Sequence, residues 1–218
     1  MLRHCTHDRP VWFDPTAYRA ACEGYNNSSA YFSLFALARF DPTVKTLLTE
    51  SQVRAGVETL AQQINTDYAR RPLTIIAVMT GSIVLLADLI RLLRMPLRVG
   101  VVQASSYRGG TTRGELTVNA EMMPDIERRD VLLIDDIFDT GHTLDNLVRL
   151  MRSMGTTSLR TAVLLRKQGR QEVVYQPDYV VFEIPNEFVV GYGLDFQDEF
   201  RNLDHIALLE PADLVPQS

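Results

Sequence analysis

The chain has 218 residues, of which 46% are hydrophobic and 22% are charged, and this composition excludes a disordered chain, a collagen-like repeat and a coiled coil. The formal net charge of -5 argues against bulk attraction to nucleic acid. Two cysteines are too few for a disulfide framework, and the start of the chain lacks the apolar core of a signal peptide. A cytoplasmic protein without membrane contact is therefore expected.

The beginning of the chain differs from the rest. Residues 1–45 are expected to form an N-terminal extension of unknown role, and residues 46–218 the functional domain. An Asp-Pro pair in the extension predicts a short helix that ends near Cys22. An aromatic and leucine cluster at 31–40 is expected to pack on the main body or at a subunit contact.

Helical and strand-like segments then alternate. Thr49 and Gln52 form a capping box at the start of a helix with one apolar face. The run 73–79 is continuously apolar and β-branched, as in a strand buried on both faces. The other predicted elements are a helix that ends near Arg94, strands at 97–102 and 131–134, a helix at 144–151 closed by Gly155, and strands at 159–165 and 179–184. This alternation predicts an α/β fold, in which a parallel sheet binds ligands beyond the carboxyl ends of its strands.

The segment 131–144 carries the clearest chemical signal. A buried strand delivers Asp135 and Asp136 at its carboxyl end, and a loop rich in Thr and Gly leads into a helix. Residues 140–143 can direct backbone N–H groups and two hydroxyls at one point, which suits a phosphate, and Gly141 allows close backbone approach. Because the two aspartates can accept hydrogen bonds from vicinal hydroxyls, the segment predicts a ribose 5-phosphate site.

A second functional segment is the stretch 105–121, which contains three glycines, Gly109, Gly110 and Gly114. It is expected to be a loop that acts as a lid, with Ser106 near its start and Tyr107 closing over the substrate. Closure would exclude water and suppress hydrolysis of an activated sugar. A passive surface loop is the alternative.

The segment with the paired aspartates resembles the phosphoribosyl-pyrophosphate signature of the type I phosphoribosyltransferases. Over residues 47–209 the chain is similar to their hypoxanthine-guanine (6-oxopurine) branch, chiefly through the segments 77–89, 105–107 and 177–195. The resemblance implies a central parallel sheet flanked by helices, with a small hood subdomain largely from about residues 167–218. It also implies purine salvage, in which phosphoribosyl pyrophosphate and hypoxanthine or guanine give IMP or GMP and pyrophosphate.

The resemblance assigns a role to each matching residue on the sugar side. Asp139 would assist proton movement at the purine N7 as N9 attacks the sugar. The ribose and 5-phosphate would be bound by Asp135, Asp136, Asp139, Thr140, Gly141, His142 and Thr143. The pyrophosphate would contact Arg201 and the loop Thr80-Gly81, which in the family often contains a non-proline cis peptide.

On the base side, the resemblance implies that Lys167 donates to the 6-oxo group and that Phe188 stacks on the purine. Val189 would contact the exocyclic edge through its backbone. Mg²⁺ is the implied cofactor, with Asp195, Asp135 and Asp136 as its ligands, and the chain has no His/Cys cluster that would suggest zinc. A homodimer or a homotetramer is the assembly that the family implies.

Three positions depart from the family pattern. Asp135 stands where the family usually has Glu, and neutral Thr80 stands where it often has Lys, which removes one cation from beside the leaving group. His142 replaces a common Lys or Leu and is expected only to bind. Two other functions are compatible with the fold: an RNA-binding regulator similar to pyrimidine-operon attenuators, and a transferase for another base such as xanthine. The regulators usually have an aromatic residue where Asp139 stands, and this chain is acidic overall.

Overall fold

The computed structural model describes residues 44–106 and 116–209. The chain divides into two units, Met1–Thr43 and Val44–Ser218, and all described residues belong to the second. The helix expected near Cys22, the aromatic cluster at 31–40 and Tyr107 lie outside the described residues.

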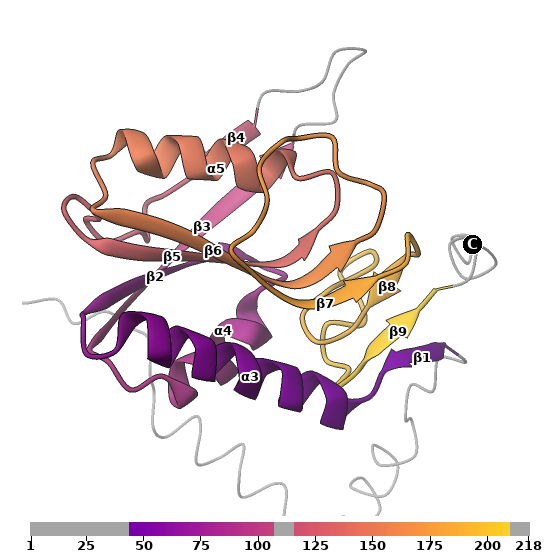
Figure 1. Cartoon of the computed structure of the whole chain (residues 1–218). Coiled ribbons are helices and arrows are strands. Elements are labelled where there is room, and N and C mark those ends of the chain that lie inside the picture. The colour runs from indigo at the N-terminus through magenta and orange to yellow at the C-terminus, as the bar shows by residue number, and fades with distance from the viewer. Residues whose placement is uncertain (1–43, 107–115, 210–218) are drawn as a thin grey trace, which may run out of the picture. The chain divides into compact units, whose positions relative to one another are not determined.

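The second unit is built on a six-stranded sheet in the order β4-β3-β2-β5-β6-β7 (Figure 1). Its strands are β2 (Leu73–Met79), β3 (Leu97–Ser106), β4 (Leu116–Asn119), β5 (Asp130–Phe138), β6 (Ser158–Lys167) and β7 (Tyr179–Ile184). All neighbouring strands are parallel except β4, which runs antiparallel to β3. Because Ala77 pairs with Ile134, Asp135 and Asp136 emerge beside the end of β2.

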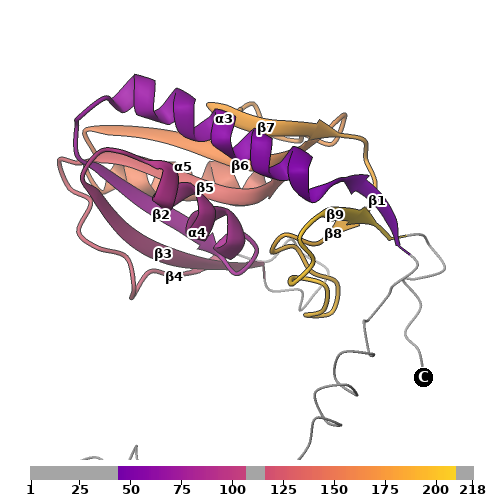
Figure 2. The ribbon, with the colours of Figure 1, turned by 90° about the horizontal axis from the view of Figure 1, so that it is seen from below.

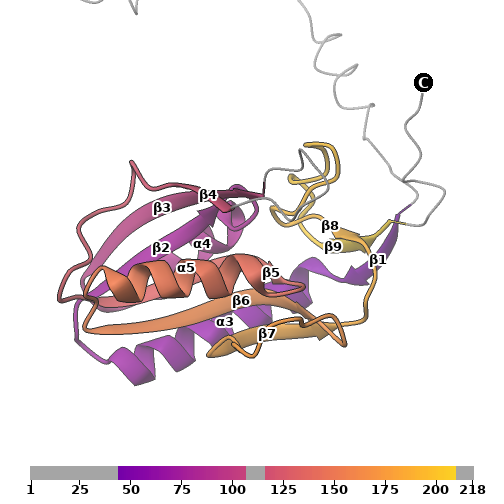
Figure 3. The ribbon, with the colours of Figure 1, turned by 90° about the horizontal axis from the view of Figure 1, so that it is seen from above.

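Helices cover both faces of this sheet. α3 (Glu50–Tyr68) and α4 (Ile83–Leu92) lie on one face, and α5 (His142–Ser153) lies on the other, as Figures 1 and 3 show. Thr49 caps α3, and the predicted capping box with Gln52 is present. The strand β2 is buried on both faces of the sheet: Ile75 and Ile76, which point to opposite faces, are both 0% exposed.

A three-stranded sheet, in the order β1-β9-β8, lies beyond the carboxyl ends of the main strands (Figure 2). It consists of β1 (Lys45–Leu48), β8 (Val189–Val190) and β9 (Ile206–Leu208), all antiparallel. We call this small sheet, together with the segment that connects β8 to β9, the hood. The resemblance implied a hood from about residues 167–218, but β7 of that range belongs to the six-stranded sheet, and the strand β1 comes from the start of the described chain.

The predicted strands 73–79 and 179–184 are confirmed as β2 and β7, whereas β3, β5 and β6 are longer than predicted. The stretch 105–121 is not wholly a loop, because β3 continues to Ser106 and pairs with β4. The strand β4 has only four residues, which are too few to show a clear alternation of apolar and polar side chains. It is a strand because it pairs with β3, and the sequence of β4 alone did not predict that pairing. None of the described helices is both long and apolar enough to cross a membrane.

Candidate active site

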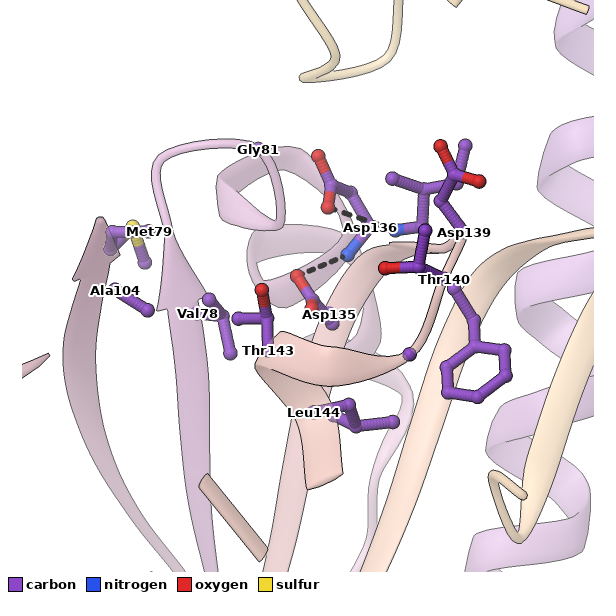
Figure 4. Close-up of a pocket in the computed structure, with 13 residues that line it drawn as sticks. Val78, Met79, Gly81, Ala104, Asp135, Asp136, Asp139, Thr140, Thr143 and Leu144 are labelled. Carbon is purple, nitrogen blue, oxygen red and sulfur yellow. Dashed lines mark hydrogen bonds between the residues drawn. The ribbon is translucent and has the colours of Figure 1, made fainter. Parts of the chain in front are cut away.

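A cavity of about 280 Å³ opens at the carboxyl ends of β2, β3 and β5 (Figure 4). Its wall combines the ends of these strands with the loop that leads into α5. Six of the residues predicted to bind ribose 5-phosphate line it: Asp135, Asp136, Asp139, Thr140, Gly141 and Thr143. The seventh, His142, is not part of this lining, and its ring pairs with Glu172 instead (Nε2 to Oε2, 3.0 Å).

Asp135 and Asp136 form the floor of the cavity. Asp135 Oδ1 accepts a hydrogen bond from the backbone N–H of Asp136 at 3.0 Å, and Asp136 Oδ1 accepts one from Ile137 at 2.8 Å (Figure 4). Burial raises the pKa of Asp135 well above its usual range, and the neighbouring charge of Asp136 raises it further. Burial also raises the pKa of Asp136. Hydroxyl donors or a cation placed against this pair would therefore be bound favourably.

The loop before α5 has the form of a phosphate site. Gly141 is the N-terminal cap of the helix and has a φ of 89°, a conformation that favours glycine. A Cβ here would lie 2.5 Å from Val173 and 2.6 Å from Phe138, so the loop packs too tightly for a side chain at this position. Unpaired N–H groups at the start of a helix attract anions.

The predicted pyrophosphate loop connects β2 to α4. The peptide bond between Met79 and Thr80 is cis, as the resemblance implied for this loop. The Thr80 side chain is exposed, whereas Gly81 lines the cavity. A Cβ on Gly81 would lie 1.6 Å from Asp136 Oδ2, so only glycine leaves room for that carboxylate.

Asp139 is held by two cations at once. Lys167, at the end of β6, places its Nζ 3.2 Å from Oδ2, and Arg170 places its Nε 3.0 Å from Oδ1. Lys167 and Asp139 are thus neighbours, as their predicted roles at one purine require. Arg170 is a residue of the site that the sequence did not predict. Its position just beyond Lys167, after the turn residue Gly169, was the only signal that could have found it.

The predicted purine platform lies outside the wall of the cavity. Phe188 is 39% exposed and packs edge-to-face on Phe196, with ring centroids 5.5 Å apart. Val189 is buried in β8, where it pairs with Leu208 of β9. An exposed aromatic ring fixed by a second ring offers its free surface to a planar ligand.

Asp195 and Arg201 lie in the segment between β8 and β9 and pair with each other at 2.8 Å. Arg201 also donates from Nη1 to the carbonyl oxygen of Gly193 at 2.8 Å. The predicted metal ligands do not form one cluster, since among the described residues no group of three or more His, Cys, Asp or Glu side chains converges on a point. Neither Asp195 nor Arg201 is part of the lining of the cavity to which Asp135 and Asp136 contribute. In proteins Mg²⁺ takes one or two carboxylates and completes its shell with water and substrate phosphates, so a full cluster of carboxylates is not required for it.

A family model for the phosphoribosyl transferase domain matches residues 43–197. The chain belongs to the phosphoribosyltransferase family. It is 38% identical over 166 residues to a hypoxanthine-guanine phosphoribosyltransferase of Staphylococcus aureus, covering 76% of this chain and 93% of that protein. The predicted family is therefore confirmed.

Solved structures of phosphoribosyltransferases share the fold. A hypoxanthine-guanine phosphoribosyltransferase from Bacillus anthracis matches with a TM-score of 0.73 and 36% identity, covering 77% of this chain and 99% of that one. A hypoxanthine phosphoribosyltransferase from Trypanosoma cruzi, solved with its product IMP, matches with a TM-score of 0.72 and 38% identity, covering 77% and 95%. The predicted type I phosphoribosyltransferase fold is confirmed.

Proposed function

We propose that this phosphoribosyltransferase acts in purine salvage, transferring 5-phosphoribosyl from phosphoribosyl pyrophosphate to N9 of hypoxanthine or guanine. The products are IMP or GMP and pyrophosphate. The relatives named above support this choice of base, and the matches cover nearly their whole length.

The observation that carries the proposal is the Lys167–Asp139 pair, with Nζ and Oδ2 3.2 Å apart. A 6-oxopurine presents O6 and N7 side by side on one edge, and a purine with a 6-amino group presents a donor in place of O6. An ammonium beside a carboxylate matches the 6-oxo edge, because Lys167 donates to O6 while Asp139 contacts N7. Adenine would place its amino group against the ammonium, where two donors meet.

The reaction follows from this placement. N9 forms a bond to C1 of the ribose as the bond from C1 to pyrophosphate breaks, and the sugar gains oxocarbenium character. Asp139 accepts the proton released at N7. Asp135 and Asp136 hold the ribose hydroxyls, the loop 140–143 holds the 5-phosphate, and Phe188 stacks on the base.

At the leaving group, Arg201 and the backbone of Gly81 bind the pyrophosphate. Asp195, Asp135 and Asp136 are the residues that would hold Mg²⁺, and the ion would supply charge neutralisation of the pyrophosphate when bound. Because Thr80 brings no cation to this loop, Arg201 is the one charged side chain that this chain is proposed to direct at the leaving group. The enzyme is further proposed to be cytoplasmic and to form a homodimer or homotetramer, as the resemblance implies.

The proposal is tested by incubating the purified protein with phosphoribosyl pyrophosphate and Mg²⁺ and one base at a time: hypoxanthine, guanine, xanthine, adenine or uracil. We expect nucleotide from hypoxanthine or guanine and none from adenine or uracil. Product from xanthine alone would make the protein a transferase for that base. No product from any base would contradict the proposal and favour the RNA-binding regulator. Light scattering on the same sample gives the oligomeric state.

A further inference from the structure

The two cations at Asp139 bind different oxygens of its carboxylate. Lys167 contacts Oδ2 at 3.2 Å, and Arg170 contacts Oδ1 at 3.0 Å. The lysine side chain is 12% exposed and the arginine side chain is 43% exposed, so Arg170 reaches Asp139 from the rim of the site. The proposed reaction gives Lys167 a partner on the base but gives Arg170 none.

Arg170 opens a short segment, residues 170–173, that runs along the phosphate loop; we call it the strap. The backbone N–H of Glu172 donates to the carbonyl oxygen of Thr140 at 2.9 Å, and its carboxylate pairs with His142 at 3.0 Å. Val173 packs beneath Gly141, at the place where a Cβ would clash. The strap thus contacts each residue of the loop from Asp139 to His142. These contacts hold Arg170, the first residue of the strap, beside Asp139.

The strap is also fastened to the strand that carries Lys167. The side-chain amide of Gln171 donates to the carbonyl oxygen of Lys167. The backbone N–H of Gln168 donates to the carbonyl oxygen of Ile184 in β7. Lys167 and Arg170 therefore lie at the two ends of one turn that these hydrogen bonds hold in place, and both side chains contact the carboxylate of Asp139.

Two contacts, one on each oxygen, can fix the orientation of the Asp139 carboxylate, whereas a single contact cannot. The terminal torsion of an aspartate is broad, so a single partner leaves the plane of the carboxylate free to turn. Lys167 cannot fix that plane well, because its ammonium group is a compact charge on a flexible stem and its donors can rotate. In the proposed reaction the same ammonium group also donates to the purine O6. The guanidinium of Arg170 donates in a rigid, planar geometry and has no other role at the base.

We propose that Arg170 is a positioning residue: its guanidinium holds Oδ1 of Asp139 so that Oδ2 faces Lys167 and the purine N7. Arg170 transfers no proton. The proton leaves N7 for Oδ2 while N9 bonds to C1 and pyrophosphate departs. This inference rests on the proposed function, because it needs a purine at Lys167 and Asp139.

The test compares steady-state kinetics of R170Q with those of the natural enzyme. R170Q removes a charge-assisted hydrogen bond to Asp139 at a partly exposed site. We expect the loss of its contribution to the orientation of Asp139 to lower kcat about ten-fold. KM for phosphoribosyl pyrophosphate is expected to stay unchanged, since the strap still holds the loop. R170K keeps the cation and is expected to recover part of the lost kcat. R166Q is the matched control, because Arg166 also leaves the end of β6 but pairs with Glu183 and Gln176.

A double-mutant cycle separates this role from a structural one. If Arg170 acts through Asp139, R170Q has no further effect on kcat in a D139N background. The proposal would be overturned if R170Q lowered kcat by the same factor in the D139N background as in the natural enzyme. It would also be overturned if R170Q kept the natural kcat, if R166Q lowered kcat as much as R170Q does, or if R170K had a kcat as low as that of R170Q. Melting temperatures check folding, and R170M, which keeps the apolar stem, replaces R170Q if the latter does not fold. An inactive natural protein would overturn the proposed function, whereas an active one with an unaffected R170Q would overturn only this inference.

Discussion

Gly193 packs directly on the backbone of Gly81. A Cβ added to Gly193 would lie 2.1 Å from the Gly81 carbonyl oxygen, and Gly193 has a φ of 101°. Because the other side of Gly81 faces Asp136, the pyrophosphate loop is fixed between the hood and the floor of the cavity. This contact couples the hood to the loop that we propose binds the leaving group.

Gly193→Ala is therefore expected to displace the pyrophosphate loop and raise KM for phosphoribosyl pyrophosphate about ten-fold or more, because the clash is with backbone and cannot be relieved by a side-chain rotation. Gly169→Ala is the matched control. Gly169 also has a positive φ, of 69°, but nothing lies within 4 Å of its added Cβ. Equal effects of the two substitutions would show that backbone strain, and not the contact with Gly81, is responsible.

Asp139→Asn is expected to lower kcat about 100- to 10,000-fold, the usual loss when general acid-base assistance is removed. Binding of phosphoribosyl pyrophosphate should be nearly intact, because the rest of the phosphate loop is unchanged. Steady-state kinetics combined with calorimetric titration of phosphoribosyl pyrophosphate measure the two effects separately. Weak binding with normal turnover would show that Asp139 is a binding residue only.

Phe188→Ala is expected to raise KM for the purine about ten-fold, since stacking of a base on an aromatic ring contributes about 1–3 kcal/mol. KM for phosphoribosyl pyrophosphate should not change. Met122→Ala serves as a control, because Met122 is 75% exposed and is not a predicted site residue. A change confined to phosphoribosyl pyrophosphate would place the base elsewhere.

Two tyrosines near the amino-terminal ends of β6 and β7 give opposite predictions for stability. The hydroxyl of Tyr68 is buried and has no hydrogen-bond partner among the described residues. The hydroxyl of Tyr179 donates to Asp67 at 2.6 Å and accepts from Arg160 at 2.7 Å. Tyr68→Phe is expected to leave the free energy of unfolding unchanged or raise it by about 1 kcal/mol, and Tyr179→Phe to lower it by about 1 kcal/mol. Urea denaturation of both variants measures the difference, and a destabilised Tyr68→Phe would reveal a partner for its hydroxyl.

The same cluster predicts a pH dependence. The hydrogen bond from Tyr179, followed by the hydrogen bond and charge of Arg160, holds the pKa of Asp67 below its usual value. A depressed folded-state pKa stabilises the protein above the unfolded-state pKa of about 4, and this stabilisation disappears as pH falls through the folded-state value. The destabilisation caused by Asp67→Asn should therefore be present at pH 7 and shrink in that acidic range. A destabilisation that is constant with pH would show that the charge of Asp67 is not involved.

Local sequence determined much of the fold and the centre of the site. The start of α3, directly after its N-cap Thr49, follows from a capping box whose partners, Thr49 and Gln52, are three residues apart. The limits of β2 and β7 follow from apolar runs that end at turn residues. The sequence could predict that the segment 135–143 contributes to one site because its residues are contiguous, and all of them except His142 line the cavity.

The tertiary structure decided the contacts between segments far apart in the chain. The strands β1 and β9 pair although they lie at opposite ends of the described chain. The few residues of each strand therefore do not indicate which strand is its partner. Asp139 meets Lys167 and Arg170 only because β5 and β6 are parallel neighbours and their carboxyl ends open at the same edge of the sheet. Gly81 meets Gly193 only because the hood folds over that edge. The sequence alone determined which chemical groups the protein brings to its site, and the packing of the sheet decided which of them touch, because hydrogen-bonded neighbours in a parallel sheet are set by the fold and not by proximity in the chain.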